Sequence, residues 1–440
     1  NSDSAMEKVI KPAEDGSTTV TTIDINLQMI AEKYVKEYYE TVGAKNIAVL
    51  MMDPNNGEIL AEATAPWFDL NNPRDLTPYF TEEELNAMTA EEKSNFLYGL
   101  WKNFALSEVY EPGSTGKAFT VAAALEEAMT YRGEKFLCTG FSTYGGHNIY
   151  CHNRLGDGEV TLDESIKYSC NVALMTLADK MGKNVFSKYQ DIFNFGKRTG
   201  VDLPGEERGL IYTVDNMDIA TLVTNAFGQN YNATMMQMAA AFSSLINDGY
   251  YYEPHVMKKI TDSSGATVRT AEADPIKTTI SASTSSAIRD MLYQTVEEGT
   301  GNKARIEGYK IGGKTGTAEK QPRDDERYLV SFISFAPVDD PQIVLYVVID
   351  EPNIPKQSDA SQATIMTNKL YKEILPYMGI FSDIDPEPEP EPETGSAEPE
   401  TGSEPETSST KREPQDEAWE PGWGFMGPIT GTSTAETTSQ

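Results

Sequence analysis

The sequence is poor in cysteine and in basic residues, and it lacks long apolar runs. Three cysteines among 440 residues cannot form a disulfide scaffold. No run reaches the roughly 18 apolar residues of a membrane-spanning helix, so we expect none in this chain. Lys and Arg number 36 against 68 Asp and Glu, which gives a net charge of -32. Because phosphate recognition needs clustered basic side chains, we expect neither a nucleic-acid partner nor polybasic binding to a membrane surface.

The two ends of the chain differ in composition from the middle. Residues 381–440 hold nine of the 24 prolines and repeat the pattern Glu-Pro-Glu-Thr. Such a segment cannot bury enough apolar surface to fold, so we expect a disordered acidic tail rich in Pro, Glu, Thr and Ser. The opening residues 1–6 look like a cloning remnant, and residues 1–17 are interpreted as remnant and lead-in. Any natural membrane anchor is expected to be absent, and residues 18–380 are left for one large domain.

Hydrophobic periodicity gives a coarse order of elements along residues 18–380. Apolar residues spaced by three and four predict a helix over 26–42, and two strands flank an Asn-Gly turn at 55–57. Further helices are predicted at 81–89, 115–130, 161–197, 214–247 and 361–375, and strands at 309–317, 328–337 and 343–350. This order favours an α+β fold, with one antiparallel sheet built from both ends (18–68 and 300–378) and a helical lobe (105–295) inserted between them.

The first reactive motif is Ser114-Thr115-Gly116-Lys117, which follows Pro112 and precedes an apolar helix. Ser114 and Lys117 therefore share one helix face near its N-terminus, where backbone amides stabilise negative charge. A buried lysine with a lowered pKa could accept the serine proton. Taken alone, a serine at this place is more often a helix cap.

Two further motifs follow in the sequence. Ser169-Cys170-Asn171 supplies a hydroxyl for proton relay and a carboxamide that both donates and accepts. Lys314-Thr315-Gly316-Thr317 falls on a predicted edge strand, where an extended peptide can pair. Gly316 leaves room for a ligand backbone, and Lys314 with the two hydroxyls can hold a carboxylate.

In this order, the three motifs resemble those of the penicillin-binding and β-lactamase-like serine transferases. The chain is most similar to the transpeptidase domain of class B penicillin-binding proteins, over residues 18–377. The resemblance also covers residues 111–117, 199–206, 226–229 with Thr234 and Gln237, 299–301, 312–318 and 331–337. It implies a penicillin-binding/β-lactamase-like fold, with a five-stranded antiparallel sheet flanked by helices and an all-helical lobe inserted.

The resemblance also implies a role for each motif residue. Ser114 would attack the penultimate D-alanine of a peptidoglycan stem peptide, and Lys117 would be the general base. Ser169, helped by Lys314, would pass a proton to the leaving D-alanine. The residues expected to bind substrate are Asn171, Thr315, Gly316 and Thr317, and the amides of Ser114 and Thr317 would form the oxyanion hole. β-Lactams would acylate Ser114 and remain bound.

The implied partners are stem peptides, β-lactam antibiotics and a lipid-linked glycan polymerase in the membrane, and the implied location is the extracytoplasmic face of a bacterial membrane. No metal or organic cofactor is expected. A role in elongation, division or sporulation stays open. Three alternative functions also stay open: a D,D-carboxypeptidase, a β-lactam-binding sensor and an inert scaffold of the same fold.

Two other enzyme classes match short stretches. Residues 82–86 match the Glu-x-x-Leu-Asn pattern of class A β-lactamases, but they precede Ser114 and are interpreted as a solvated helix. Residues 308–315 match a P-loop, but Gly316 and a later strand follow where a helix is required.

The cysteines leave three interpretations open. Cys138, Cys151 and Cys170 are inert thiols, or Cys138 and Cys151 bind zinc with His147 and His152, or two cysteines form a disulfide. The zinc spacing matches no familiar finger. Sporulation-type class B proteins resemble this chain in pairing a cysteine of the second motif with one upstream. That resemblance implies a redox pair of Cys151 and Cys170 beside Ser169 and Asn171.

Overall fold

A computed structural model describes residues 16–384. The chain divides into two units, residues 1–385 and 386–440. The predicted remnant at 1–17 and the predicted acidic tail at 381–440 lie almost wholly outside the described residues. Within 16–384, none of the helices combines the length and apolar character needed to cross a bilayer.

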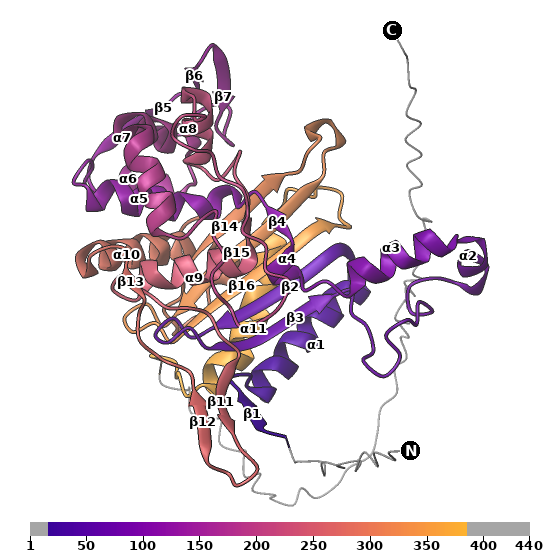
Figure 1. Ribbon diagram of the computed structural model, residues 1–440. Coiled ribbons are helices and arrows are strands. Elements are labelled where there is room, and N and C mark those ends of the chain that lie inside the picture. Colours follow the sequence, from indigo (N-terminus) through magenta and orange to yellow (C-terminus); the bar gives the residue numbers. More distant parts are fainter. Residues whose placement is uncertain (1–15, 385–440) are drawn as a thin grey trace, which may run out of the picture. The chain divides into compact units, whose positions relative to one another are not determined.

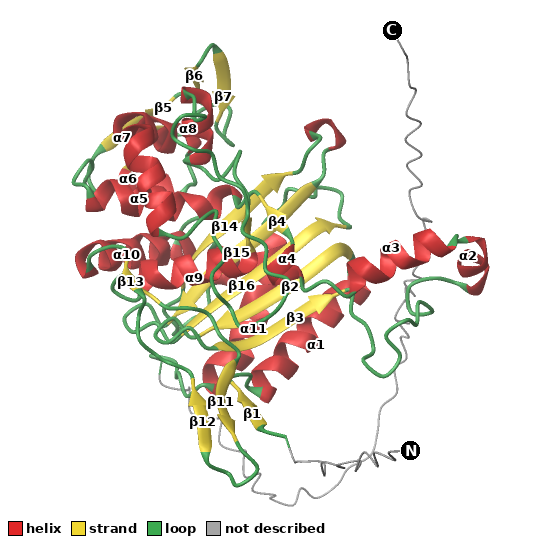
Figure 2. Ribbon diagram, viewed as in Figure 1, coloured by secondary structure: helices red, strands yellow, loops and turns green. Residues whose placement is uncertain are grey.

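The centre of the fold is a five-stranded antiparallel sheet (Figures 1 and 2). Its order is β14 (Gly312–Glu319), β15 (Tyr328–Ala336), β16 (Ile343–Pro352), β2 (Ala44–Met52) and β3 (Ile59–Ala65). The strands β16 and β2 pair along their length, so the two ends of the domain meet in mid-sheet. This confirms the predicted sheet, and it leaves β14, which carries the third motif, at an edge.

Both faces of the sheet are covered, because its central strands are apolar at successive positions. In β2, Ala48, Leu50 and Met52 pack into one hydrophobic cluster, and Ile47, Val49 and Met51 pack into the other. The helices α1 (Ile25–Thr41) and α11 (Ser361–Tyr377) cover the second face. The helices α4 (Phe104–Ser107) and α9 (Met235–Ile246) contact the first.

The inserted lobe is built mainly from helices. Its members are α5 (Lys117–Glu126), α6 (Leu162–Lys167), α7 (Asn171–Ile192), α8 (Ile219–Asn225), α9 and α10 (Ala282–Glu297). The helix predicted over 161–197 is broken between α6 and α7, and the one over 214–247 is broken between α8 and α9. Both breaks contain a residue with positive φ, Ser169 at 60° and Gly228 at 85°, which a right-handed helix cannot accommodate.

The lobe is not purely helical, which corrects the prediction. Short strands pair within it: β5 (Lys135–Cys138) with β8 (Gly158–Thr161), β6 (Phe141–Tyr144) with β7 (His147–Tyr150), and β10 (Tyr250–Tyr251) with β13 (Lys277–Thr278). Strands of two to four residues are too short to produce a recognisable alternation in the sequence.

The remaining elements extend the domain at its edges. The strands β1 (Thr18–Thr21), β11 (Met257–Thr261) and β12 (Thr267–Thr270) form a separate sheet, and β4 (Val109–Tyr110) pairs with β9 (Ala233–Thr234). The helices α2 (Glu82–Ala87) and α3 (Ala90–Leu100) project away from the main sheet (Figure 1). No residue of α2 is buried, which confirms that residues 82–86 form a solvated helix. The P-loop pattern ends inside strand β14, which excludes a P-loop.

Candidate active site

The first motif lies on the 3₁₀ turn η1 (Gly113–Gly116), which leads directly into α5. Ser114 is half-buried and Lys117 is fully buried. Gly113 has φ +58°, and a Cβ there would lie 2.4 Å from the Thr317 carbonyl oxygen. The turn is therefore pressed against the edge strand β14. This close approach brings the first and third motifs together.

The second motif forms the break between α6 and α7. Ser169 has φ +60°, a left-handed conformation that is strained for a residue other than glycine. Cys170 is the N-cap of α7 and Asn171 is its first residue. The strained turn holds the Ser169 hydroxyl toward both lysines of the site.

Two buried lysines converge on Ser169. Lys117 Nζ donates to the Ser169 hydroxyl at 3.0 Å, to the Ser169 carbonyl at 2.6 Å and to Asn171 Oδ1 at 2.7 Å. Lys314 Nζ donates to the same hydroxyl at 3.1 Å. The Ser169 hydroxyl thus bridges the first and third motifs, as a proton relay requires.

Burial changes the protonation of both lysines. It lowers the pKa of Lys117 from 10.5 to about 8. It also lowers the pKa of Lys314 well below 10.5, and repulsion by Lys117 acts in the same direction. A lysine with such a pKa has a substantial neutral fraction near neutral pH, and only the neutral amine can accept a proton.

The third motif lies on β14, the edge strand of the main sheet, where Lys314, Thr315 and Gly316 are buried and Thr317 is partly exposed. Thr315 Oγ1 donates to Thr300 Oγ1 at 3.0 Å. A Cβ at Gly316 would lie 2.3 Å from Ser331 Oγ, so only glycine fits there. Thr317 is half-buried beside Gly113. The motif thereby offers a hydroxyl pair and free strand edge to an extended ligand.

Not every expected contact is present. Within residues 16–384, no hydrogen bond joins the Ser114 hydroxyl to Lys117, whose donors are directed at Ser169 and Asn171. Asn171 Nδ2 donates to the Tyr150 carbonyl at 3.1 Å. Sequence reasoning assigned no role to Tyr150 or Thr300. Thr300 lies in the Gly-Thr-Gly stretch at 299–301, which the family resemblance included, so it could have been assigned to the site. No motif in the sequence pointed to Tyr150.

Gly228 packs closely against Gly113 of the η1 turn. Gly228 has φ +85°, and a Cβ added there would lie 1.8 Å from the Gly113 carbonyl oxygen. We expect Gly228→Ala to lower the free energy of unfolding by about 2–4 kcal/mol, because it displaces the turn. If Ser114 is acylated by benzylpenicillin, as the resemblance implies, the same change should slow that acylation at least tenfold. Denaturant unfolding and acylation kinetics measure both effects.

The control for this change is Gly205→Ala. Gly205 has a similar φ of +87° but has open space around its Cβ position. Gly205→Ala should lower the free energy of unfolding by about 1–2 kcal/mol and leave the acylation rate unchanged. Equal effects of the two substitutions on acylation would show that contact with Gly113 does not matter.

The three cysteines are buried free thiols. Cys138, Cys151, Cys170 and Asp157 place their ligand atoms within 4.8 Å of one another. His147 is exposed on β7 and lies outside this group, so the zinc ligand set suggested by the sequence is wrong. Cysteine sulfur and carboxylate oxygen are donors that zinc accepts.

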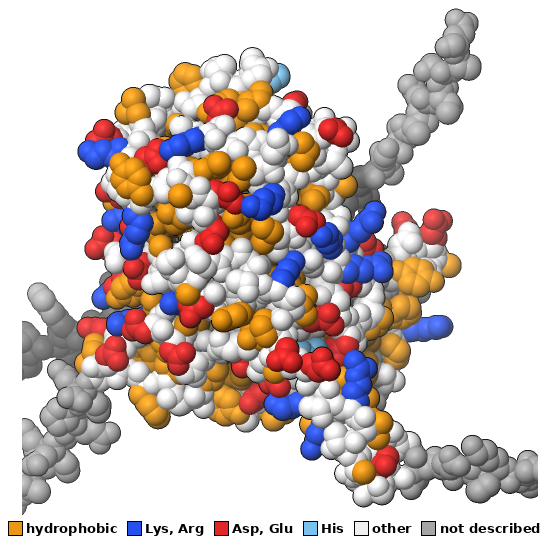
Figure 3. Space-filling model, turned by 60° about the vertical axis from the view of Figure 1, so that its left-hand side comes forward, with side chains coloured by type: hydrophobic (Ala, Val, Ile, Leu, Met, Phe, Trp, Pro, Cys, Tyr) orange, Lys and Arg blue, Asp and Glu red, His pale blue; other side chains and the backbone are white. Residues whose placement is uncertain are grey.

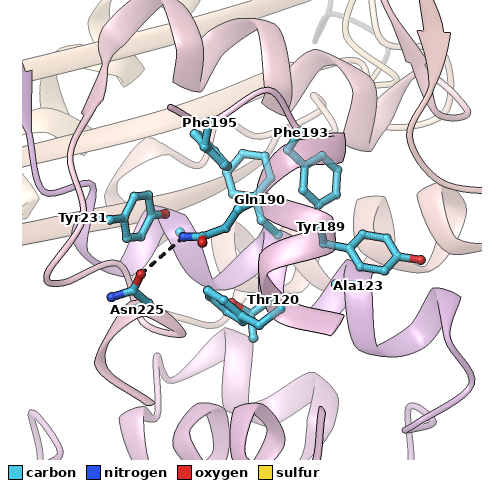
Figure 4. A pocket seen from close by; sticks show the side chains of 11 residues that line it. Thr120, Ala123, Tyr189, Gln190, Phe193, Phe195, Asn225 and Tyr231 are labelled. Carbon is cyan, nitrogen blue, oxygen red and sulfur yellow. Dashed lines mark hydrogen bonds between the residues drawn. The ribbon is translucent and has the colours of Figure 1, made fainter. Parts of the chain in front are cut away.

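A small internal cavity lies behind η1. Its volume is about 20 Å³, and aromatic rings from α5, α7 and the following loop line it, with Gln190 hydrogen-bonded to Asn225 (Figure 4). This volume is enough for a single water molecule. The cavity therefore belongs to the support of α5 and not to a substrate site.

The charges on the surface are mixed. On the face shown in Figure 3, basic side chains are interspersed with acidic ones. Elsewhere among the described residues many basic side chains are paired with acidic ones, for example Arg132 with Asp163 and Asp290, and Lys135 with Glu159. This face offers no basic patch for a phosphate backbone.

Comparison with known proteins identifies the family. A profile described as the penicillin binding protein transpeptidase domain matches residues 47–372. Stage V sporulation protein D of Bacillus subtilis is 33% identical, over 84% of this chain and 55% of that protein. Penicillin-binding protein PbpB of Mycolicibacterium smegmatis is 30% identical, over 77% of this chain and 51% of that protein. The chain thus spans about half the length of these relatives.

The fold agrees with this match. The crystal structure of penicillin-binding protein 3 from Mycobacterium tuberculosis in complex with aztreonam superposes with a TM-score of 0.72 and 26% identity. The match covers 85% of this chain and 82% of that one. Since the profile match includes all three motifs and the sheet that positions them, the chain belongs to the penicillin-binding protein family as a transpeptidase domain of the class B type.

Proposed function

We propose that this protein is a serine D,D-transpeptidase that cross-links peptidoglycan stem peptides and is acylated by β-lactams. The observation that carries the proposal is the convergence of Lys117 and Lys314 on the Ser169 hydroxyl, next to half-buried Ser114. Relatives named peptidoglycan D,D-transpeptidase, such as MrdA of Acinetobacter baumannii, support it.

In the proposed reaction, neutral Lys117 takes the proton of Ser114 as Oγ attacks the penultimate D-alanine carbonyl. Amides of Ser114 and Thr317 stabilise the oxyanion. As the C–N bond to the terminal D-alanine breaks, a proton returns through Ser169 and Lys314 to the leaving amine. The amine of a second stem peptide then attacks the acyl ester, the ester C–O bond breaks, and the proton that the amine loses restores the Ser114 hydroxyl.

Asn171, Thr315, Gly316 and Thr317 would hold the substrate. Asn171 already accepts from Lys117, so its carboxamide is oriented before substrate binds. Thr315 and Thr317 would bind the terminal carboxylate of the donor or the carboxylate of a β-lactam, beside Lys314. Gly316 would let the donor backbone lie against β14.

An exchange assay tests the activity. A depsipeptide or peptide donor ending in D-alanine is incubated with labelled D-amino acid as acceptor, and the products are separated by mass. A labelled exchange product supports a transpeptidase. Release of D-alanine without exchange indicates a carboxypeptidase. Acylation by β-lactams without either product indicates a sensor, and no acylation at all indicates an inert scaffold.

The setting of this activity is part of the proposal. The relatives named as penicillin-binding proteins and transpeptidases support a place at the extracytoplasmic face of a bacterial membrane. A lipid-linked glycan polymerase would supply the strands to be cross-linked. The match to a stage V sporulation protein favours sporulation among the possible roles.

We also propose that Cys151 and Cys170 act as a redox pair. Cys170 lies between Ser169 and Asn171, and the Asn171 amide donates to Cys151 Sγ at 3.3 Å. A disulfide here would displace the second motif, so we expect oxidised protein to be acylated by benzylpenicillin at least tenfold more slowly than reduced protein. Equal rates for protein with and without the mapped disulfide would refute the switch.

A further inference from the structure

The three buried thiols share their surroundings with a carboxylate. Cys138 ends β5, Cys151 follows β7, Cys170 caps α7, and Asp157 lies in the loop before β8. Their ligand atoms all lie within 4.8 Å of one another, and each cysteine is at most 3% exposed. Asp157 is only partly buried, so the group places one carboxylate that water still reaches beside three buried sulfurs, at the edge of the lobe.

Tight loops hold these donors in place. A Cβ at Gly140, where φ is +91°, would lie 2.2 Å from the Arg154 carbonyl oxygen. A Cβ at Gly156, where φ is +84°, would lie 2.4 Å from the Cys138 carbonyl oxygen. The Cys151 amide also donates to the Gly140 carbonyl at 2.9 Å. The loops after β5 and before β8 are therefore pinned together, and the donors are arranged before any ligand binds.

Surrounding hydrogen bonds suit anionic ligands. Backbone amides donate to two sulfurs, Asn171 to Cys151 at 3.3 Å and Ala173 to Cys170 at 3.4 Å. Asn153 Nδ2 donates to Asp157 Oδ1 at 2.8 Å, which directs the other oxygen toward Cys151 Sγ at 3.9 Å. Such outer contacts orient metal ligands and stabilise thiolates.

We propose that Cys138, Cys151, Cys170 and Asp157 form a tetrahedral site for a thiophilic divalent cation, with zinc as its natural occupant. With zinc–sulfur bonds of about 2.3 Å, tetrahedral sulfurs lie roughly 3.8 Å apart, so the cluster needs only a small contraction. Binding releases three thiol protons to solvent and involves no electron transfer. The zinc ligands considered from the sequence were Cys138, Cys151, His147 and His152, and they did not include Cys170 or Asp157.

The site would position the second motif. Cys170 is covalently adjacent to Ser169 and Asn171, so a metal bond to its sulfur fixes the turn that presents both side chains to Lys117. The ion also requires Cys151 and Cys170 as thiolates. Metal binding and the proposed disulfide therefore exclude each other, and oxidation of the pair would release the ion. This inference does not depend on the proposed transpeptidation.

Metal titration of the full chain tests the site. The protein is reduced, stripped with a chelator and titrated with Zn²⁺ and with Co²⁺. We expect one ion per chain by elemental analysis, and intense thiolate–cobalt absorption typical of a tetrahedral site. Cys138→Ser should weaken binding about 100-fold or more, and Asp157→Asn at least about tenfold. Exposed His147→Ala, the matched control, should change it less than about twofold.

Several results would overturn the proposal. These are no stoichiometric binding by reduced wild type, unchanged affinity in Cys138→Ser, or equal weakening by His147→Ala. If Cys138→Ser does not fold, the isosteric Asp157→Asn decides, since a folded variant with full affinity removes Asp157 from the site. Retention of the ion by protein with a mapped Cys151–Cys170 disulfide would also contradict it.

Discussion

Ser114→Ala is expected to abolish covalent modification by benzylpenicillin. In the proposed reaction the acyl bond forms at Ser114 Oγ on the η1 turn, whereas Ser169 lies in the break before α7 and Thr315 lies on β14. The second-order rate of acylation should fall on the order of 10⁴-fold or more, to background. A fluorescent penicillin, quantified on denaturing gels over time, measures this rate.

The control is Ser94→Ala, a change of the same size on exposed α3. The Ser94→Ala protein should be acylated by benzylpenicillin at the wild-type rate. An adduct on the Ser114→Ala protein at a comparable rate would place the nucleophile elsewhere, and peptide mapping of that adduct would locate it.

Lys117→Ala is expected to slow acylation by about 10²–10⁴-fold, the usual contribution of a general base. This role should also give the acylation rate a characteristic dependence on pH. Burial lowers the pKa of Lys117 to about 8, and only the neutral amine accepts the Ser114 proton. In wild type, acylation should therefore rise about tenfold per pH unit up to roughly pH 8 and level off above it.

The pH profile separates a catalytic role from a structural one. Lys117→Ala should lose the rise with pH as well as the rate, whereas exposed Lys183→Ala should keep both. A wild-type rate that is flat between about pH 6 and 8, or a Lys117→Ala profile that keeps the same rise, would mean that another group accepts the proton. Lys314, whose pKa is also lowered by burial, would be the next candidate.

Much of the fold follows from local sequence. The strands β15 and β16 are long runs of β-branched and aromatic residues, and the helix α1 has a clear apolar face, so both were predicted within a few residues. The three motifs were located by residue type and order. Their common site was predictable because the resemblance is to a fold in which these motifs meet.

The geometry of the second motif was not predictable in the same way. Periodicity runs through residues 161–197 as one helix, because the interruption is three residues long and its left-handed conformation falls on a serine. Tertiary contacts impose that conformation, through Lys117 and Lys314. The cluster around Asp157 could not be predicted for the same reason, because tertiary structure brings together residues from separate elements.

The lifetime of the penicilloyl adduct tests the central claim most directly. The intact mass of the wild-type protein is followed for hours after a single equivalent of benzylpenicillin, under reducing conditions. The account predicts one adduct per chain that persists while free drug is not hydrolysed, because within residues 16–384 the one Glu-x-x-Leu-Asn match lies on solvated α2. An adduct that disappears with turnover of the drug would indicate a β-lactamase, and no adduct would contradict the transpeptidase assignment itself.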